Sequence, residues 1–146
     1  MTVAVPTGVY YAASHMTVDR RELPALHELE SEVMDVVWDL PSPITVRAVL
    51  AEVNSRSGRE RAYTTVMTVM RRLDSKGLLA RKRDGKTDHY GAACSRREYA
   101  DARAAAQVLA LVDEYGDVAL AHFAAEMAKL DPARREQLRE LARARG

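Results

Sequence analysis

Threonine and arginine side chains gather in one short stretch of the chain, Ala62-Tyr-Thr-Thr-Val-Met-Thr-Val-Met-Arg-Arg-Leu73. Apolar residues recur within it at helical spacing, which predicts a helix over residues 62–76 with one buried face. The buried face comprises Val66, Val69, Met70 and Leu73. The outward face comprises Thr64, Thr65, Met67, Thr68, Arg71, Arg72 and Ser75.

The chemistry of this outward face suits the major groove of DNA. Hydroxyl groups bond to phosphates or base edges, methyl groups contact thymine, and a guanidinium reaches guanine or a phosphate. A recognition helix makes most base contacts near its N-terminal end, which here is Thr64 to Thr68. The alternative is that these threonines are polar residues that an exposed helix merely tolerates, although β-branched residues are mediocre helix formers.

Basic residues surround the expected helix, while the net charge of the whole chain is only +1. Residues 23–55 carry six acids against Arg47, and residues 56–90 carry ten Arg or Lys against four acids. A concentrated basic segment is typical of phosphate binding, although a solvated basic face is the plain alternative. The flanking cations are Arg59, Arg61, Arg81, Lys82, Arg83 and Lys86. Tyr63 begins the helix, and its hydroxyl either meets a phosphate or packs on the neighbouring hairpin.

Two helices are expected before the recognition helix. One apolar face runs from Leu26 to Leu40 and is stopped by Pro41 and Pro43. Thr45 is a suitable N-cap for a second helix, which carries valines and a leucine at helical spacing up to residue 53. We expect Trp38, at the end of the first helix, to lie in the core with its indole N–H on a backbone carbonyl.

A β-hairpin is expected after the recognition helix. Gly77 suits the left-handed position that ends a helix. Asp84-Gly85 then separates two short extended runs, residues 78–83 and 87–90, which is a strong hairpin signal. Three helices followed by such a hairpin predict a mainly α winged helix-turn-helix domain over residues 23–93.

The region from 94 to 146 is predicted to be all-α. Ser95 and Glu98 form a capping box, and 16 of the 56 residues after position 90 are alanine. Asp117 and Asp131 are expected N-caps. Such alanine-rich helices form a thin core, so we expect this region to be a homodimerisation domain. Its expected contact residues are Val108, Leu109, Val112, Leu120, Phe123 and Met127.

No catalytic constellation, metal site or cofactor motif is found in the sequence. The four histidines are scattered, and Cys94 is the single cysteine, so neither a nucleophile nor a metal-ligand set is supported. We therefore expect a non-enzymatic protein with no cofactor. No apolar run is long enough for a membrane span, and the N-terminus lacks a signal-peptide pattern, so we expect a cytoplasmic protein. Residues 1–22 are expected to be a flexible tail.

Three stretches resemble the penicillinase-repressor (BlaI/MecI) family: Leu29-Glu-Ser-Glu-Val-Met-Asp-Val-Val-Trp38, Thr45-Val-Arg-Ala-Val49, and Ala62 to Gly77 with Leu78. The resemblance covers about residues 27–130, and Ala62 to Gly77 is its most specific part. It implies a dimeric winged-helix repressor of β-lactam-resistance or related genes that binds inverted-repeat operators and dimerises through its C-terminal helices. The DNA-reading positions that it implies are Thr64, Thr65, Met67, Thr68 and Arg72.

The resemblance also implies a partner, a sensor-activated protease that cuts an Asn-Phe bond in the dimerisation helices. The matching position here is His122-Phe123, where histidine replaces asparagine. Phe123 is equally well explained as a plain core residue. A copper-responsive branch of the family carries closely spaced C-terminal cysteines, and the isolated Cys94 does not match it.

The sequence leaves one alternative function open. A winged helix can also serve as a protein–protein interaction scaffold without specific DNA binding. The basic segment 56–90 favours the DNA-binding interpretation, because a scaffold does not need such a charge.

Overall fold

The computed structural model describes residues 23–145, so the expected flexible tail over residues 1–22 lies outside the described residues. The chain divides into two compact units, with the division between Ala104 and Ala105. The division falls inside a long helix, α4 (Arg96–Tyr115), and therefore later than the expected boundary at residue 93. Each unit is described separately below.

Three helices pack together in the first unit: α1 (Glu28–Asp39), α2 (Val46–Ser57) and α3 (Tyr63–Ser75). As predicted, Thr45 caps α2 by accepting a 3.2 Å hydrogen bond from the Ala48 N–H. The valines of the three helices form the core with both strands of the hairpin. The predicted buried face of α3 is confirmed in full, since Val66, Val69, Met70 and Leu73 are all buried.

Gly77 ends α3 in the way that its sequence position predicts. Its φ of 78° is in the left-handed region. Glycine adopts this conformation at little energetic cost because it has no Cβ. The Leu78 N–H reaches the Leu73 carbonyl at 3.0 Å, and the Gly77 N–H reaches Asp74 at 3.0 Å. These bonds satisfy carbonyls at the end of α3 and turn the chain into the sheet.

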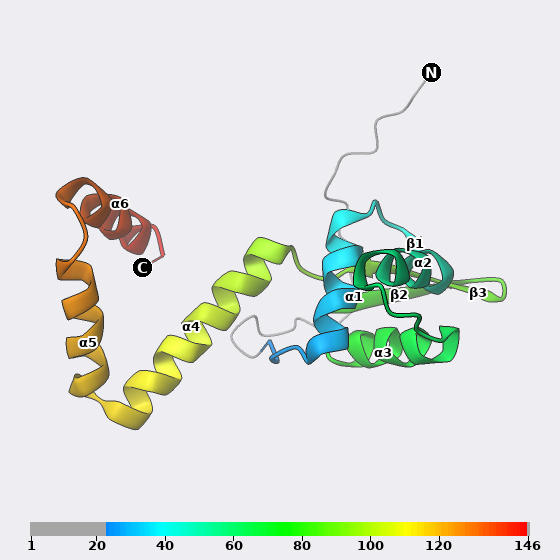
Figure 1. Cartoon of the computed structure of the whole chain (residues 1–146), viewed down its shortest axis with the longest axis horizontal. Helices are drawn as coiled ribbons and strands as arrows, with labels where there is room; N and C mark the ends of the chain where they lie inside the picture. The colour runs from blue at the N-terminus through cyan, green and yellow to red at the C-terminus, as the bar shows by residue number, and fades with distance from the viewer. Residues whose placement is uncertain (1–22, 146) are drawn as a thin grey trace, which may run out of the picture. The chain divides into compact units, whose positions relative to one another are not determined.

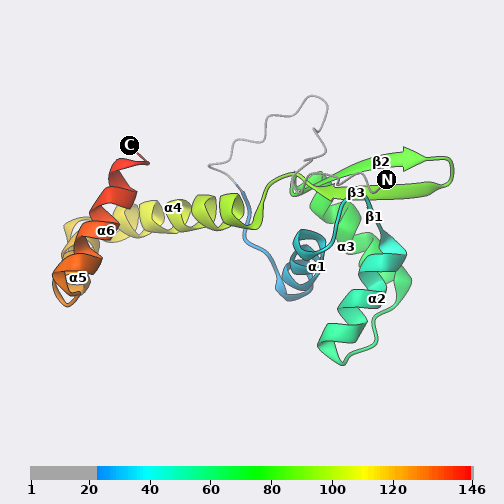
Figure 2. The same ribbon diagram turned by 90° about the horizontal axis from the view of Figure 1, so that it is seen from above.

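The sheet is antiparallel and has three strands in the order β1-β3-β2: β1 (Ile44–Thr45), β2 (Leu79–Asp84) and β3 (Thr87–Ala92). Asp84 pairs with Thr87, so Gly85 and Lys86 occupy the turn, one residue later than expected. Gly85 has the positive φ, 59°, that such a tight turn requires. The two-residue strand β1 was not predicted. The tip of the β2–β3 hairpin projects beyond helices α1 to α3 (Figures 1 and 2).

The first turns of α4 dock onto α1 within the first unit. The predicted capping box is present, with Ser95 and Glu98 exchanging two hydrogen bonds of 2.9 and 3.0 Å. The Trp38 indole N–H donates to the Cys94 carbonyl at 2.9 Å, as expected, and its ring lies 5.6 Å from that of Tyr99. Burial raises the pKa of Tyr99, whose hydroxyl donates to the Pro24 carbonyl.

The second unit contains the remainder of α4, then α5 (Asp117–Ala128) and α6 (Pro132–Arg143). Asp131 caps α6 by accepting from the Arg134 N–H at 3.0 Å, as predicted. The expected N-cap of α5 was wrong: Gly116 is the cap and Asp117 is the first helical residue. Gly116 takes this position because the chain needs a positive φ there, 56°, which disfavours aspartate. Among the described residues of α4, α5 and α6, none is buried within the chain.

Candidate nucleic-acid interface

The outward face of α3 lies on the surface of the first unit, as the sequence predicts. Thr64, Thr65, Thr68, Arg71 and Arg72 are all exposed, opposite the buried apolar face of the same helix. A thirteen-residue helix with one face fixed in the core holds these side chains in a constant register. The geometry therefore offers hydroxyl, methyl and guanidinium groups on one rigid surface.

Two hydroxyls on this face are already used within the helix. Thr68 donates to the Thr64 carbonyl at 2.8 Å, and Ser75 donates to the Arg71 carbonyl at 3.1 Å. A hydroxyl that donates in this way retains only its acceptor lone pairs. Thr68 is thus equipped to accept from a base amino group or to present its methyl to thymine.

Met67 differs from the other residues expected on the outward face. Its side chain is only partly exposed, because it packs against the core of the first unit. It is consequently the least accessible member of the expected DNA-reading set.

Arg81 is held by two carboxylates rather than projecting freely. Its guanidinium lies 3.6 Å from Asp74 at the end of α3 and 3.7 Å from Asp88 on β3. Beneath this cluster, Tyr90 is fully buried, and burial together with the Asp88 charge raises its pKa. The cluster joins the hairpin to the C-terminal end of α3. The ion pairs of Arg81 therefore help to position the hairpin relative to that helix.

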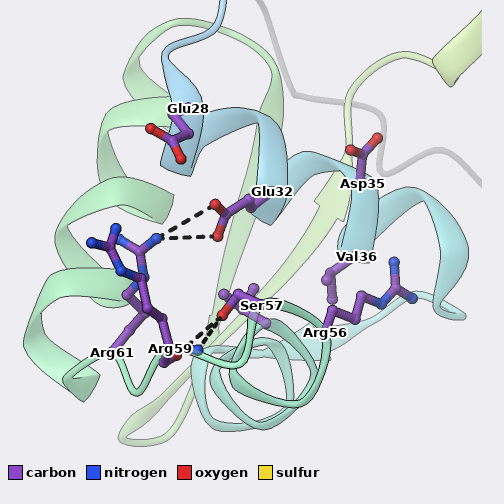
Figure 3. Close-up of a pocket in the computed structure, with 9 residues that line it drawn as sticks. Glu28, Glu32, Asp35, Val36, Arg56, Ser57, Arg59 and Arg61 are labelled. Carbon is purple, nitrogen blue, oxygen red and sulfur yellow. Dashed lines mark hydrogen bonds and ion pairs between the residues drawn. The ribbon is translucent and has the colours of Figure 1, made fainter.

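Arg61 is also engaged within the protein. It lies on a charged groove of about 350 Å³ between α1 and the α2–α3 loop, where its guanidinium meets Glu32 at 3.4 Å (Figure 3). Its backbone N–H donates to the Asn54 side chain at 2.8 Å, which fixes the loop ahead of α3. Only about a fifth of the Arg61 side chain, 19%, is exposed.

The other expected cations keep their charge available. In the part of the chain that the structure describes, no ion pair is formed by Arg59, Arg71, Arg72, Lys82, Arg83 or Lys86, and all six are exposed. Arg83 only donates to the Gly85 carbonyl at 3.3 Å. Unpaired cations on a projecting hairpin beside a polar helix face are suited to a phosphodiester backbone.

Part of the α3 face lines an open groove of about 510 Å³ against the N-terminus of α1. Thr64, Thr65, Thr68 and Arg72 line it together with His27, which was not expected at the site. The His27 side chain is 84% exposed. Its position could not be read from periodicity, because it precedes the first turn of α1.

A buried ion pair anchors the other end of α3. Glu30 on α1 is only 2% exposed, and the Lys76 ammonium reaches its carboxylate at 2.6 Å. Burial alone would raise the pKa of Glu30, but the hydrogen bonds from Lys76 and from the His27 N–H, with the Lys76 charge, outweigh it and lower the pKa. The pair ties the end of the expected recognition helix to α1.

Charge counting assigned no role to one further surface residue, Arg47. Arg47 is the single Arg or Lys of the acidic segment 23–55, and it lies on the first turn of α2. Its guanidinium carbon is 5.8 Å from the centre of the Tyr63 ring, so Tyr63 lies beside the first turn of α2. The signal that could have located Arg47 is its position directly after the N-cap region of α2.

The residues expected to mediate dimerisation lie on the second unit without intrachain burial. Leu109, Leu120, Phe123 and Val108 are 63, 50, 40 and 43% exposed. Val112 and Met127 are partly buried. Four more apolar residues of these helices, outside the expected contact set, are also exposed: Leu111, Tyr115, Val118 and Leu141.

Other kinds of site are not supported by the described residues. Within residues 23–145, no group of three or more His, Cys, Asp or Glu side chains is placed to hold a metal ion. No helix in that range is both long and apolar enough to cross a bilayer.

Comparison with known proteins decides the family. A family model described as penicillinase repressor matches residues 26–144. The chain belongs to the penicillinase-repressor family. A curated relative of this penicillinase-repressor chain, the transcriptional regulator BlaI of Mycobacterium tuberculosis, is 38% identical over 104 residues. The match covers 70% of this chain and 73% of the relative.

Solved structures of the penicillinase-repressor family also resemble the chain. One is the monomeric form of Bacillus licheniformis BlaI in complex with the blaP half-operator, at 28% identity and a TM-score of 0.43. A second is the DNA-binding domain of the repressor BlaI, at 28% identity and a TM-score of 0.45. Each match covers 53% of this chain and 92% of the solved chain. The relatives are transcriptional regulators, in agreement with the expectation that this member is not an enzyme.

Proposed function

We propose that this chain is a homodimeric, sequence-specific repressor that acts in the cytoplasm and reads an inverted-repeat operator through α3. The observation that carries the proposal is the exposed face of α3, where Thr64, Thr65, Thr68 and Arg72 share one rigid surface. The unpaired cations of the hairpin add the affinity for phosphates that such a surface needs. A relative that is 38% identical to this chain over 104 residues is a transcriptional regulator.

Binding to DNA tests the proposal directly. The probe is a labelled duplex of the DNA upstream of the chain's own gene, measured by fluorescence anisotropy at about 50 and about 200 mM salt. We expect tight binding at low salt and a steep loss at high salt. No binding, or binding insensitive to salt, contradicts the repressor function and leaves the protein-interaction scaffold as the better account.

Base reading is separable from phosphate binding by two substitutions on α3. We expect Thr65→Ala and Arg72→Ala to weaken binding to the upstream duplex by roughly tenfold, because each removes groups that face base edges. Binding to a random-sequence duplex should change little. An equal loss on both duplexes would show that these side chains contact the backbone only.

Homodimerisation through α4 to α6 is proposed from the apolar side chains that these helices leave exposed. Leu109 and Val118 are each more than three-fifths exposed, at 63 and 61%. Apolar groups of this size gain about 1.5–3 kcal/mol each on full burial, so a second copy is a strong source of stability. A symmetric dimer would also place two α3 helices for the two halves of an inverted repeat.

Proteolysis at His122–Phe123 is the proposed means of inactivation. Both side chains are exposed on α5, as recognition by a protease requires. Cleavage would separate the second half of α5, together with α6, from the rest of the interface and so weaken pairing. Mass spectrometry of the chain from cells treated with a β-lactam should show a fragment that begins at Phe123. Persistence of the intact chain while its target genes are induced would contradict this mechanism.

A further inference from the structure

The Arg47 guanidinium is held over the ring of Tyr63 at the entrance to α3. Arg47 is exposed on the first turn of α2, and Tyr63, the first residue of α3, is 44% exposed. The distance from the guanidinium carbon to the ring centre is 5.8 Å, within the range of a cation–π contact. We propose that Arg47 and Tyr63 form a phosphate-binding pair that sets the register of α3 on the DNA backbone, an inference that rests on the proposed function.

Arg47, like Arg71 and Arg72 on α3, forms no ion pair in the described part of the chain, whereas three other arginines of this unit do. Arg56, Arg61 and Arg96 each meet at least one carboxylate. Among the residues that the structure describes, no carboxylate forms an ion pair with Arg47. A stacked guanidinium keeps its full charge and its N–H edges, which suit the bidentate geometry of a phosphate.

The position of the pair links it to the helix that is expected to read bases. Tyr63 directly precedes Thr64 and Thr65. Arg47 follows β1, whose Thr45 pairs with His89 on the hairpin strand β3. A phosphate bound here would therefore lie between the first turn of α3 and the middle of strand β3. Phosphate contacts fix orientation, and base contacts then specify sequence.

The ring of Tyr63 acts as a platform, and its hydroxyl is not the binding group. An exposed cation–π contact is weak, so it biases the Arg47 rotamer without removing its freedom to reach a phosphate. The pair thus predicts that a phenyl ring at position 63 preserves binding, whereas an aliphatic side chain does not.

Substitution of Arg47 tests the charge. The full-length chain is titrated onto a random-sequence duplex over a range of salt concentrations. We expect Arg47→Ala to weaken binding roughly fivefold at low salt and to reduce the salt slope by about one. Arg139→Ala, which removes an exposed guanidinium on α6, is the control and should leave the slope unchanged. An unaltered slope in Arg47→Ala would overturn the proposal.

Substitution of Tyr63 tests the platform. We expect Tyr63→Phe to bind like the unmodified chain, and Tyr63→Leu to lose part of the affinity that Arg47→Ala loses. In the Arg47→Ala background, Tyr63→Leu should have no further effect. A Phe variant as weak as the Leu variant, or additive losses in the double variant, would overturn the pairing.

Failure of this inference is distinguishable from failure of the proposed function. If the unmodified chain binds the duplex in a salt-dependent way and Arg47→Ala does the same with an equal slope, only the pair is wrong. If the unmodified chain does not bind at about 50 mM salt, the DNA-binding function itself is wrong. Thermal unfolding of each variant by circular dichroism shows whether any loss of binding results from unfolding.

Discussion

The two units of the chain differ in where their apolar side chains lie. The first unit, up to Ala104, buries valines, leucines and methionines from three helices and the hairpin around one core. The second, from Ala105, has helices of similar length but no buried residue among those described. Helix formation therefore does not show that a region is stable alone, since most helical stability comes from packing an apolar face. The first unit has a core of its own, and the proposed homodimer would supply the second with the surface that its apolar side chains lack within the chain.

Truncating one leucine in each unit to alanine should give the largest difference between the units in the loss of free energy of unfolding. Leu73→Ala removes a fully buried side chain, so we expect a loss of about 2–5 kcal/mol in the free energy of unfolding. Leu120→Ala removes the same atoms from a side chain that is 50% exposed. Its effect should depend on protein concentration, because it acts on pairing.

Urea unfolding at two protein concentrations measures both variants. We expect the Leu73→Ala loss to be the same at each concentration. A Leu120→Ala loss that does not vary with concentration would contradict pairing through Leu120.

Replacing one lysine in each unit by methionine should give a smaller difference between the units in the loss of free energy of unfolding. Lys76→Met leaves the buried Glu30 carboxylate without its partner and should cost about 2 kcal/mol, below the value for a fully buried pair because Lys76 is 26% exposed. Lys129→Met breaks a 2.7 Å pair with Glu126 in which both side chains are about 70% exposed, at 69 and 72%. That pair should contribute nothing measurable. Equal losses in the two variants would remove the distinction between the units.

Acidification should produce the smallest effect, which we expect at Glu30 in the first unit. The pKa of Glu30 is lowered in the folded chain from its usual 4.5, so the folded state binds this proton less readily than the unfolded state. The resulting stability is fully present above pH 4.5 and is lost as the pH falls through the folded pKa. Urea unfolding measures the difference in the free energy of unfolding between Glu30→Gln and the unmodified chain. This difference should become smaller as the pH falls from about 6 to about 3. A difference that stays constant with pH would show that the Glu30 carboxylate does not contribute through its charge.

The sequence predicted the features of the fold that depend on local spacing. The buried face of α3 is confirmed because four apolar residues at helical intervals leave only one way to face a core. The end of α3 at Gly77, the Thr45 cap and the capping box at Ser95 are confirmed because each depends on neighbouring residues alone.

Features that depend on distant residues were missed. Glu30 meets Lys76 across 46 positions, and periodicity gave no reason to bury a glutamate. The carboxylates that the fold brings beside Arg81 and Arg61, Asp74 and Glu32, were not expected, and contact of the two arginines with DNA stays a prediction. Strand β1 was missed because two residues pair only through the distant β3.

The account predicts that residues 105–145 complete their packing in a second copy of the chain. Sedimentation equilibrium of the full chain at micromolar concentration measures this most directly, with a variant that carries Leu109→Lys and Val118→Lys as the comparison. We expect twice the chain mass for the unmodified protein, and the mass of one chain for the variant with the fold of its first unit retained. A single-chain mass for the unmodified protein, with α4 to α6 still helical by circular dichroism, would contradict the account.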